Sequence, residues 1–423
     1  MSDVLDDLHW RGLIALSTDE TALRSALASG PVVCYGGFDP TGASLHVGNL
    51  VLILTMRRLQ LAGHRPLALV GGATGLIGDP SGKSDERNLN ERDVVAEWVE
   101  RIRRQIEPHL DFDGPNAAQM VNNLDWTAPL SAIDFLRDVG KHFPVNRMLG
   151  RESVSARLAE GGISYTEFSY QILQAMDYLE LYRRYGCTLQ AGGSDQWGNL
   201  TAGVDLIRRV TGTGVHALAT PLITKPDGTK YGKTAGAAVW LAPQMMSPYA
   251  FFQFFVNRED AEVGKLLRVF SFRSREEIEE LEKATAERPA ARIGQRALAA
   301  ELTTLVHGPA EFAAADAASR ALFGQGELGA LDARTLSDAL AEVPGTAVGG
   351  SELPPVIDLL AETGLVASKS AGRRVIEEGG AYVNNVKVSS VDAVPDRADL
   401  LHGRWLVLRR GKRSVAGVEV RPS

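Results

Sequence analysis

In this 423-residue chain, several polar side chains occur at positions where an apolar run ends and a helical pattern begins. In "CYGGFDPTGASLHVGNL", a strand-like run precedes an Asp-Pro turn, and His46 and Asn49 open an apolar helical pattern that Gly63 closes. Three positions apart, both side chains share the first helical turn. The free N–H groups and helix dipole of such a turn attract anions, and Gly48 lets a ligand approach. The stretch therefore predicts a phosphate or nucleotide site, although a lone histidine at a helix start is more often a cap.

Two glycine-rich segments follow other strand-like runs. "GGATGLIGDPSGKSDER" contains an Asp-Pro turn at Asp79 and two cations, Lys83 and Arg87. Such a loop can approach a ligand closely and hold positive charge over it. "LQAGGSDQWGN" places Asp195 and Gln196 at the start of a helix, where a carboxylate can accept hydrogen bonds from sugar hydroxyls. Either segment alone is typical of an ordinary turn.

A third motif is the helical pattern "TEFSYQILQAMDYLELY". At 100° per residue, Tyr170, Gln174 and Asp177 fall within about 60° of one another and form a polar stripe on a mainly apolar helix. A solvated face is the simpler interpretation, but the apolar neighbours leave little room for one. The stripe therefore predicts part of a pocket for an amino acid.

The fourth motif, "TKPDGTKYGKTAG", carries Lys230 and Lys233 among glycines after a turn at Asp227-Gly228. Lysines in such a loop are usually solvated. A loop that closes over a polyphosphate has the same composition, because its cations must arrive after the ligand and leave with the product.

The order of apolar segments divides the chain into several parts. Between about Pro31 and Pro221, strand-like runs alternate with helical patterns, which predicts a mostly parallel sheet with helices on both faces and ligands at the carboxyl ends of the strands. From about Ser247 to Phe323, apolar residues recur every three or four positions, which predicts an all-α domain. We expect an α/β domain over 1–246, a helical domain over 247–324, a linker with at most one short helix over 325–351, and a small α+β domain over 352–423.

Composition excludes several classes of protein. With 44% hydrophobic and 23% charged residues, the chain has the composition of a soluble protein of two or three domains. No segment has the apolar length of a membrane span and the acidic start is not a signal peptide, so we expect a cytoplasmic protein. Two cysteines, Cys34 and Cys187, are too few for a disulfide framework or a cysteine zinc site. The net charge of −7 argues against a protein that coats nucleic acid over its whole surface.

Basic residues are concentrated at the end of the chain. From Glu352 to Ser423 there are 11 Lys and Arg against 9 Asp and Glu, whereas the rest is acidic. Two short helices there precede strands joined by a turn at Asn384-Asn385. The segment is suited to contacts with nucleic-acid phosphates, although any single arginine also fits a solvated surface. The candidate contacts are Arg373, Arg374, Arg409, Arg410, Lys412 and Arg413.

In order and spacing, these motifs resemble the bacterial tyrosyl-tRNA synthetases, a family of class I aminoacyl-tRNA synthetases. "LHVGN" resembles the H-x-G-H element of the family, and "KYGKT" resembles its lysine-rich second signature. Six further segments are similar to segments of the family: "YGGFDPTGASLHVG", "GGATGLIGDPSGK", "NNLDW", "FLRDVGKHF", "TEFSYQ" and "GGSDQWGN". The resemblance covers essentially the whole chain, and the tail from Leu353 resembles an S4-type RNA-binding module. It implies a Rossmann-like catalytic domain, tyrosine, ATP and tRNA(Tyr) as substrates, and a homodimer formed near "FLRDVGKHFPVN". It also implies Mg²⁺ bound with ATP, with no protein-only metal site.

The resemblance implies roles for individual residues. The expected tyrosine-binding residues are Tyr35 and Asp177 at the phenol hydroxyl, Asp79, Tyr170 and Gln174 at the ammonium group, and Gln196 near the carboxylate. The expected ATP-binding and catalytic residues are Gly193 and Asp195 at the ribose, Gly37, Asp39 and Gly48 in the same pocket, Thr41 and His46 at the γ-phosphate with Asn49 beside them, and Lys83, Arg87, Lys230 and Lys233 at the pyrophosphate.

The sequence departs from the family pattern at three positions that face the nucleotide sugar or base in the family. Asn49 replaces the second histidine of the H-x-G-H element, Gly36 stands where many relatives have cysteine, and Leu52 stands where some have threonine. Asn49 can still donate a hydrogen bond.

The resemblance predicts a tyrosine–tRNA ligase, which makes tyrosyl-adenylate and pyrophosphate from tyrosine and ATP and passes tyrosine to the 3′ end of tRNA. Two alternatives remain. A tryptophanyl-tRNA synthetase has the same fold, but Tyr35 with Asp177 and the S4-like tail argue against it. A non-catalytic RNA-binding relative would lack phosphate-binding residues, whereas Thr41, His46 and both lysines of "KYGKT" are present.

Overall fold

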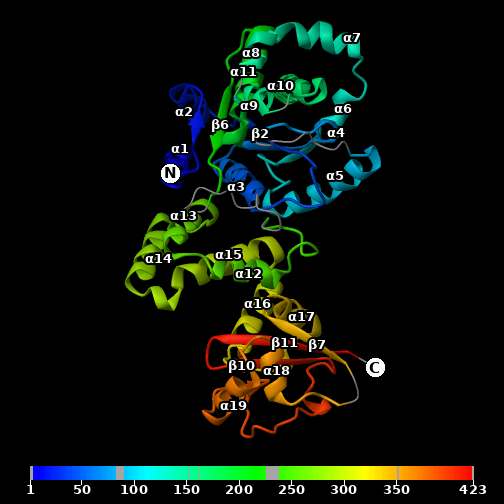
Figure 1. The fold of residues 1–423 in the computed structure, drawn as a ribbon. Coiled ribbons are helices and arrows are strands. Elements are labelled where there is room, and N and C mark those ends of the chain that lie inside the picture. The colour runs from blue at the N-terminus through cyan, green and yellow to red at the C-terminus, as the bar shows by residue number, and fades with distance from the viewer. Residues whose placement is uncertain are drawn as a thin grey trace. The chain divides into compact units, whose positions relative to one another are not determined.

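The chain forms two compact units. A computed structural model describes residues 3–81, 90–150, 152–160, 162–224, 238–349 and 352–421. The first unit contains Met1–Met245 and Gly264–Arg273, and the second contains Met246–Val263 and Ser274–Ser423 (Figure 1). The expected phosphate-binding residues Lys83, Arg87, Lys230 and Lys233 lie outside the described residues.

The first unit contains a six-stranded sheet in the order β1-β6-β5-β2-β3-β4. Its strands are β1 Leu16–Ser17, β2 Val33–Phe38, β3 Arg65–Val70, β4 Gln119–Asn122, β5 Cys187–Gly193 and β6 His216–Thr220. Adjacent strands are parallel except for β1, which runs antiparallel to β6. In β3 every residue after Arg65 is buried, as is typical of parallel strands covered on both faces. The predicted parallel sheet is confirmed.

Helices lie on both faces of this sheet (Figure 1). The helices of the first unit are α1 Val4–Trp10, α2 Glu20–Ala28, α3 Val47–Leu61, α4 Thr74–Ile77, α5 Arg92–Ile106, α6 Leu124–Thr127, α7 Ala132–Asp134, α8 Val145–Leu149, α9 Glu152–Glu160, α10 Tyr165–Tyr185 and α11 Trp197–Thr211. Ser164 caps the start of α10, and Gly186 ends it in the left-handed conformation that glycine allows. Tyr178 of α10 and Leu206 of α11 share one buried cluster with Leu67 of β3. No helix in the described ranges is long and apolar enough to span a membrane.

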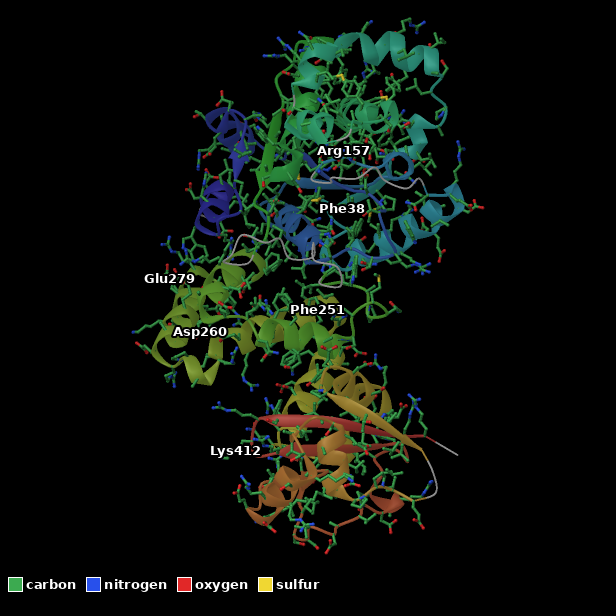
Figure 2. The ribbon with its side chains drawn as sticks, in the orientation of Figure 1. Phe38, Arg157, Phe251, Asp260, Glu279 and Lys412 are labelled. Carbon is green, nitrogen blue, oxygen red and sulfur yellow. The ribbon has the colours of Figure 1, made fainter. Side chains whose placement is uncertain are left out.

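The second unit begins with a group of helices. They are α12 Pro248–Val256, α13 Asp260–Phe270, α14 Arg275–Glu287, α15 Ile293–His307, α16 Pro309–Leu322 and α17 Ala333–Ala341; the last seven residues of α13 belong to the first unit. Phe251 of α12, labelled in Figure 2, packs edge-on against Phe255, with ring centroids 5.1 Å apart, and against His307 of α15 at 4.9 Å. The helices predicted from residue 247 onward are therefore present.

A five-stranded sheet with the order β7-β11-β10-β8-β9 completes the second unit. Its strands are β7 Gly345–Gly349, β8 Ala381–Val383, β9 Val386–Lys387, β10 Trp405–Arg410 and β11 Ser414–Arg421, and two helices, α18 Val356–Glu362 and α19 Lys369–Glu377, precede β8. Asn384 and Asn385 have positive φ angles of 48° and 66°, as the predicted two-residue turn requires. Both predicted short helices and this turn are confirmed.

The prediction of a linker over 325–351 is wrong. This segment contains α17, which packs against α12 and α16, and β7, which pairs in parallel with β11. Leu336, Ala339 and Leu340 form one buried face of α17, at the helical spacing of three and four residues. The glycines of "GTAVGG" indicated a loop, but β7 is stabilised by hydrogen bonds to a strand about 70 positions further along the chain.

Candidate active site

A cavity of about 500 Å³ lies where β2, β5 and β6 end and α3 begins. Fourteen of the predicted tyrosine- and ATP-site residues line it: Tyr35, Gly37, Asp39, Thr41, His46, Gly48, Asn49, Asp79, Tyr170, Gln174, Asp177, Gly193, Asp195 and Gln196. The stripe on α10 therefore faces the cavity, and the alternative of a solvated face is wrong. The four predicted cations of the pyrophosphate site lie outside the described residues.

His46 is the N-cap of α3. Its Nδ1 accepts a hydrogen bond from Gly48 N at 3.0 Å, and Asn49 Oδ1 accepts one from His46 N at 3.1 Å. Burial lowers the pKa of His46, so the ring is neutral at pH 7. With Nδ1 as acceptor, the proton of the neutral ring lies on Nε2, which can donate to a ligand. Asn49 likewise uses its oxygen for the cap and keeps its amide hydrogens as donors.

Asp39 connects three elements at the base of the cavity. Its two carboxylate oxygens accept hydrogen bonds from Tyr170 on α10 and from Thr74 on α4, each at 2.6 Å. Gly71 makes this approach possible, because a Cβ atom there would lie 2.0 Å from Asp39 Oδ1. Burial and the neighbouring Asp39 raise the pKa of Tyr170 well above its usual value, so the phenol remains protonated and donates.

Asp79 and Gln196 form a second polar group on the wall of the cavity. Gln196 Nε2 donates to Asp79 Oδ2 at 2.6 Å, and Ser81 N donates to Asp79 Oδ1 at 2.9 Å. Asn199 Nδ2 donates to Gln196 Oε1 at 2.9 Å and so fixes the orientation of the amide. At the neighbouring strand end, a Cβ atom at Gly193 would lie 2.8 Å from Asp195 Oδ1, so a larger residue there would displace the Asp195 carboxylate.

Tyr35 and Asp177 lie at the buried end, each 2% exposed. The Tyr35 hydroxyl has no hydrogen-bond partner among the described residues. Asp177 accepts from Trp126 Nε1 at 2.8 Å and from Asn123 Nδ2 at 3.0 Å. Burial raises the pKa of Asp177 to about 7, against the opposing effect of these two donors. A phenol hydroxyl could satisfy both Tyr35 and Asp177.

Gly36 and Leu52, two of the three residues that depart from the family pattern, lie close together where β2 packs against α3. A Cβ atom at Gly36 would lie 2.5 Å from Met56 Sδ and 3.2 Å from two side-chain atoms of Leu52. Leu52 itself lines the cavity. A larger residue at position 36 therefore requires movement of α3 side chains, which links these two positions.

Sequence reasoning missed several residues of this region. Thr74, Gln190 and Trp240 line the cavity, and Asn123 and Trp126 bind Asp177. "NNLDW" did carry a signal, because Asn122 ends β4 at the same edge of the sheet as the other polar motifs. No group of three or more His, Cys, Asp or Glu suited to a metal ion occurs within the described residues.

The candidate tRNA contacts in the second unit divide into two groups. Arg373, Arg374, Arg410, Lys412 and Arg413 are exposed, and Figure 2 labels Lys412. Arg409 is only 8% exposed. Its guanidinium lies 4.0 Å from the centroid of the Tyr382 ring, and its Nε donates to Asn385 Oδ1 at 3.2 Å. Arg409 ends a run of five buried residues in β10, so we leave it out of the tRNA contacts proposed below.

Two family models match the chain. Residues 27–324 match the tRNA synthetases class I (W and Y), and residues 335–416 match the tyrosine–tRNA ligase SYY-like C-terminal domain. The parallel sheet and the cavity at its carboxyl edge are thus those of a class I aminoacyl-tRNA synthetase.

Full-length relatives identify the family more narrowly. The chain is 69% identical over 422 residues to the tyrosine–tRNA ligase of Streptomyces avermitilis and 66% identical over 422 residues to that of Streptomyces coelicolor, with 99% of each chain covered. A solved structure of a C-terminally truncated Aspergillus nidulans mitochondrial tyrosyl-tRNA synthetase matches with a TM-score of 0.70 and 28% identity, over 76% of this chain and 95% of that chain. The chain belongs to the tyrosine–tRNA ligase family.

Proposed function

We propose that this chain activates L-tyrosine with ATP, giving tyrosyl-adenylate and pyrophosphate, and transfers the tyrosyl group to the 3′ end of tRNA(Tyr). Membership of the tyrosine–tRNA ligase family supports the reaction. The single observation that carries the choice of amino acid is the buried pair of Tyr35 and Asp177, because the unpaired Tyr35 hydroxyl and the adjacent Asp177 carboxylate suit a phenol. A site built to bind a hydroxyl rejects an analogue that lacks it, because its buried polar groups would remain unpaired.

The rest of the tyrosine site is assigned from the cavity walls. Asp79, Tyr170 and Gln174 bind the ammonium group in this proposal, and Gln196 lies near the carboxylate. Gln174 supports the assignment, because its buried Oε1 has no hydrogen-bond partner among the described residues and can accept from an ammonium group. The Asp79–Gln196 hydrogen bond would hold the groups for the two ends of the amino acid together.

The ATP site is assigned to the other part of the cavity. Gly193 and Asp195 would meet the ribose, and Thr41 and His46 would meet the γ-phosphate, with Asn49 beside them. Gly37, Asp39 and Gly48, which line the same cavity, are assigned to this site as well. The N-terminus of α3 supports the assignment, because His46 Nε2 and the Asn49 amide remain available as donors above a helix dipole that favours anions. The proposed pyrophosphate contacts Lys83, Arg87, Lys230 and Lys233 lie outside the described residues.

The reaction requires positioning and charge stabilisation. The tyrosine carboxylate, already ionised at pH 7, attacks the α-phosphorus in line, and the bond to pyrophosphate breaks, so no general base is needed. Negative charge on the leaving group would be stabilised by the donors of Thr41 and His46 and by the lysines. In the second step a ribose hydroxyl of tRNA attacks the adenylate carbonyl and AMP leaves.

Mg²⁺ is proposed as a partner of ATP, where it neutralises phosphate charge when bound. The carboxylates of Asp39 and Asp79 each accept two hydrogen bonds from the protein, and no role as metal ligands is proposed for them. The metal is therefore assigned to the phosphate oxygens of the substrate, with no protein-only site.

We also propose a homodimer, a role for the tail and a cellular location. Large apolar side chains are exposed around "FLRDVGKHFPVN", where Ile133 is 69% and Val145 58% exposed, and a second copy would cover them.

The S4-like segment from about residue 352 would bind tRNA through Arg373, Arg374, Arg410, Lys412 and Arg413, which are exposed. The cytoplasm, where tRNA is charged, is the proposed location.

Amino-acid-dependent ATP–pyrophosphate exchange over the twenty standard amino acids tests the proposal. We expect exchange with tyrosine and essentially none with the other nineteen. Exchange with tryptophan but not tyrosine would refute the assignment of the pocket, and absence of all exchange would favour a non-catalytic RNA-binding relative.

A further inference from the structure

A glutamine outside the cavity holds the segment that leads to His46. Gln105 lies in the last turn of α5 and does not line the cavity. Its Oε1 accepts a hydrogen bond from Leu45 N at 2.9 Å and is 3.1 Å from Ser44 Oγ, within hydrogen-bond distance. Ser44 and Leu45 are 7% and 3% exposed and Gln105 is half-buried, so both contacts are partly buried.

The opposite side of this segment is also fixed. Ser44 Oγ accepts from Ala242 N at 3.0 Å, and Leu45 O accepts from Leu241 N at 2.9 Å. Residues 44–47 therefore lie between α5 and residues 239–242, bonded to both.

Residues 39–45 have no regular secondary structure, and the backbone hydrogen bonds of the isolated antiparallel bridge between His46 and Trp240 hold only the end of this segment. Thr41 lies in this segment and His46 directly follows it. The Leu45 N–H is buried and needs an acceptor, and Gln105 is the side chain that supplies it. A displacement of Ser44 and Leu45 would change the positions of Thr41 and His46 at the cavity.

We propose that Gln105 is a positioning residue for tyrosine activation, which holds Ser44 and Leu45 so that Thr41 and His46 meet the γ-phosphate. This inference rests on the proposed function of Thr41 and His46. Contacts to the phosphates strengthen as charge develops on the leaving group, so loss of the alignment should lower the rate of adenylate formation and leave tyrosine binding unchanged.

Three variants of the full chain test the proposal. Gln105→Met keeps the length of the side chain and removes the amide acceptor, whereas Gln105→Glu keeps an acceptor at the same place. Arg104→Ala, an exposed change in the same turn of α5, is the control for effects on the helix. The readouts are the stopped-flow rate of tyrosyl-adenylate formation, the tyrosine Kd from equilibrium dialysis and the KM for ATP.

We expect Gln105→Met to form the adenylate about 10- to 100-fold more slowly, the range that a misplacement of about 1 Å produces, with a tyrosine Kd within about twofold of wild type. Gln105→Glu and Arg104→Ala should stay near the wild-type rate. Because Gln105 acts through the Thr41 segment, Gln105→Met combined with Thr41→Ala should lose less than the product of the two single losses.

Any of three results would overturn the proposal. Gln105→Met could form the adenylate at the wild-type rate, or Gln105→Glu could lose as much of this rate as Gln105→Met. In the third case, the rate in the double variant falls by the full product of the two single decreases. If Gln105→Met does not fold, Ser44→Ala removes the hydroxyl that contacts Gln105 Oε1 and should slow adenylate formation in the same way; an unchanged rate would also overturn it. Failure of the wild-type chain to form tyrosyl-adenylate would instead refute the proposed function.

Discussion

Trp126 donates a hydrogen bond of 2.8 Å from its indole Nε1 to Oδ1 of Asp177, which lies 51 positions further along the chain. Asn123 donates to the other carboxylate oxygen at 3.0 Å. Two donors do not compensate fully for burial, because the pKa of Asp177 still rises to about 7. The folded chain therefore holds a carboxyl that binds a proton more tightly than it does in the unfolded chain.

The first prediction concerns the pH dependence of stability. The pKa of Asp177 rises from 3.8 to about 7 on folding, so its contribution to the unfolding free energy is complete below about pH 4 and is lost as the pH rises to about 7. The melting temperature of wild type minus that of Asp177→Asn should therefore fall between pH 4 and 7 and stay level above pH 8. Scanning calorimetry at several pH values measures this difference, and a flat difference from pH 4 to 7 would contradict it.

The second prediction is that Tyr35→Phe stabilises the free protein and weakens selection for tyrosine. The buried hydroxyl lacks a partner within the described residues, and such a group costs about 1–3 kcal/mol. Removing it should raise the melting temperature, while loss of one hydrogen bond to bound tyrosine, about 0.5–1.5 kcal/mol, should lower the preference for tyrosine over phenylalanine by up to about tenfold.

Pyrophosphate exchange with the two amino acids measures this preference. Tyr178→Phe is the matched control, because its hydroxyl donates to His216 O at 2.8 Å and its loss should lower the melting temperature. An unchanged preference in Tyr35→Phe would show that Tyr35 does not bind the phenol of the substrate.

Much of the cavity could be predicted from the sequence because strand ends and helix starts carry local signals. The Asp-Pro turns, the glycines before Ser194 and the stripe on α10 all mark positions that the parallel sheet brings to one edge. The pairing of Trp126 with Asp177 could not be predicted, because the contact joins distant segments. The burial of Arg409 could not be predicted for a similar reason, because it depends on what covers that face of β10.

The third prediction concerns Gly71. A Cβ atom there would lie 2.0 Å from Asp39 Oδ1 and 2.4 Å from Thr74 Oγ1, so alanine cannot fit without breaking their hydrogen bond. Gly71→Ala should lower the unfolding free energy by about 1–3 kcal/mol and weaken tyrosine binding through displaced Asp39 and Tyr170. Gly214→Ala, where nothing lies within 4 Å of the added atom, is the control. Denaturant unfolding and equilibrium dialysis measure the two effects; wild-type values in Gly71→Ala would contradict the packing.

The fourth prediction separates two arginines of the tail. Arg409→Ala should destabilise the second unit, because Tyr382 and Asn385 lose a buried partner. Arg373→Ala removes an exposed cation and should leave the melting temperature unchanged. It should weaken tRNA binding and reduce the slope of log affinity against log salt by about one if Arg373 contacts a phosphate. Filter binding at several salt concentrations is the measurement. An unchanged salt slope in Arg373→Ala would remove it from the tRNA site.

The fifth prediction places the separation between catalysis and tRNA binding after α17. A chain that ends at Glu342 keeps the buried Leu336 and Ala339 of α17 against α12 and α16, whereas a chain that ends at Gly324 loses them. The longer chain should therefore melt at the higher temperature. Both lack the basic tail but contain every proposed catalytic residue, and the Aspergillus nidulans relative gave a solved structure after C-terminal truncation.

We expect the chain ending at Glu342 to retain tyrosine-dependent pyrophosphate exchange with an unchanged KM for tyrosine, and to lose most tRNA charging. The loss should grow with salt concentration, because the missing module contributes phosphate contacts whose strength depends on released counterions. Exchange and charging assays on the same preparation distinguish the two activities. Undiminished kcat/KM for tRNA at physiological salt would show that the tail does not bind tRNA, since the rest of the chain would then supply all the binding that charging requires.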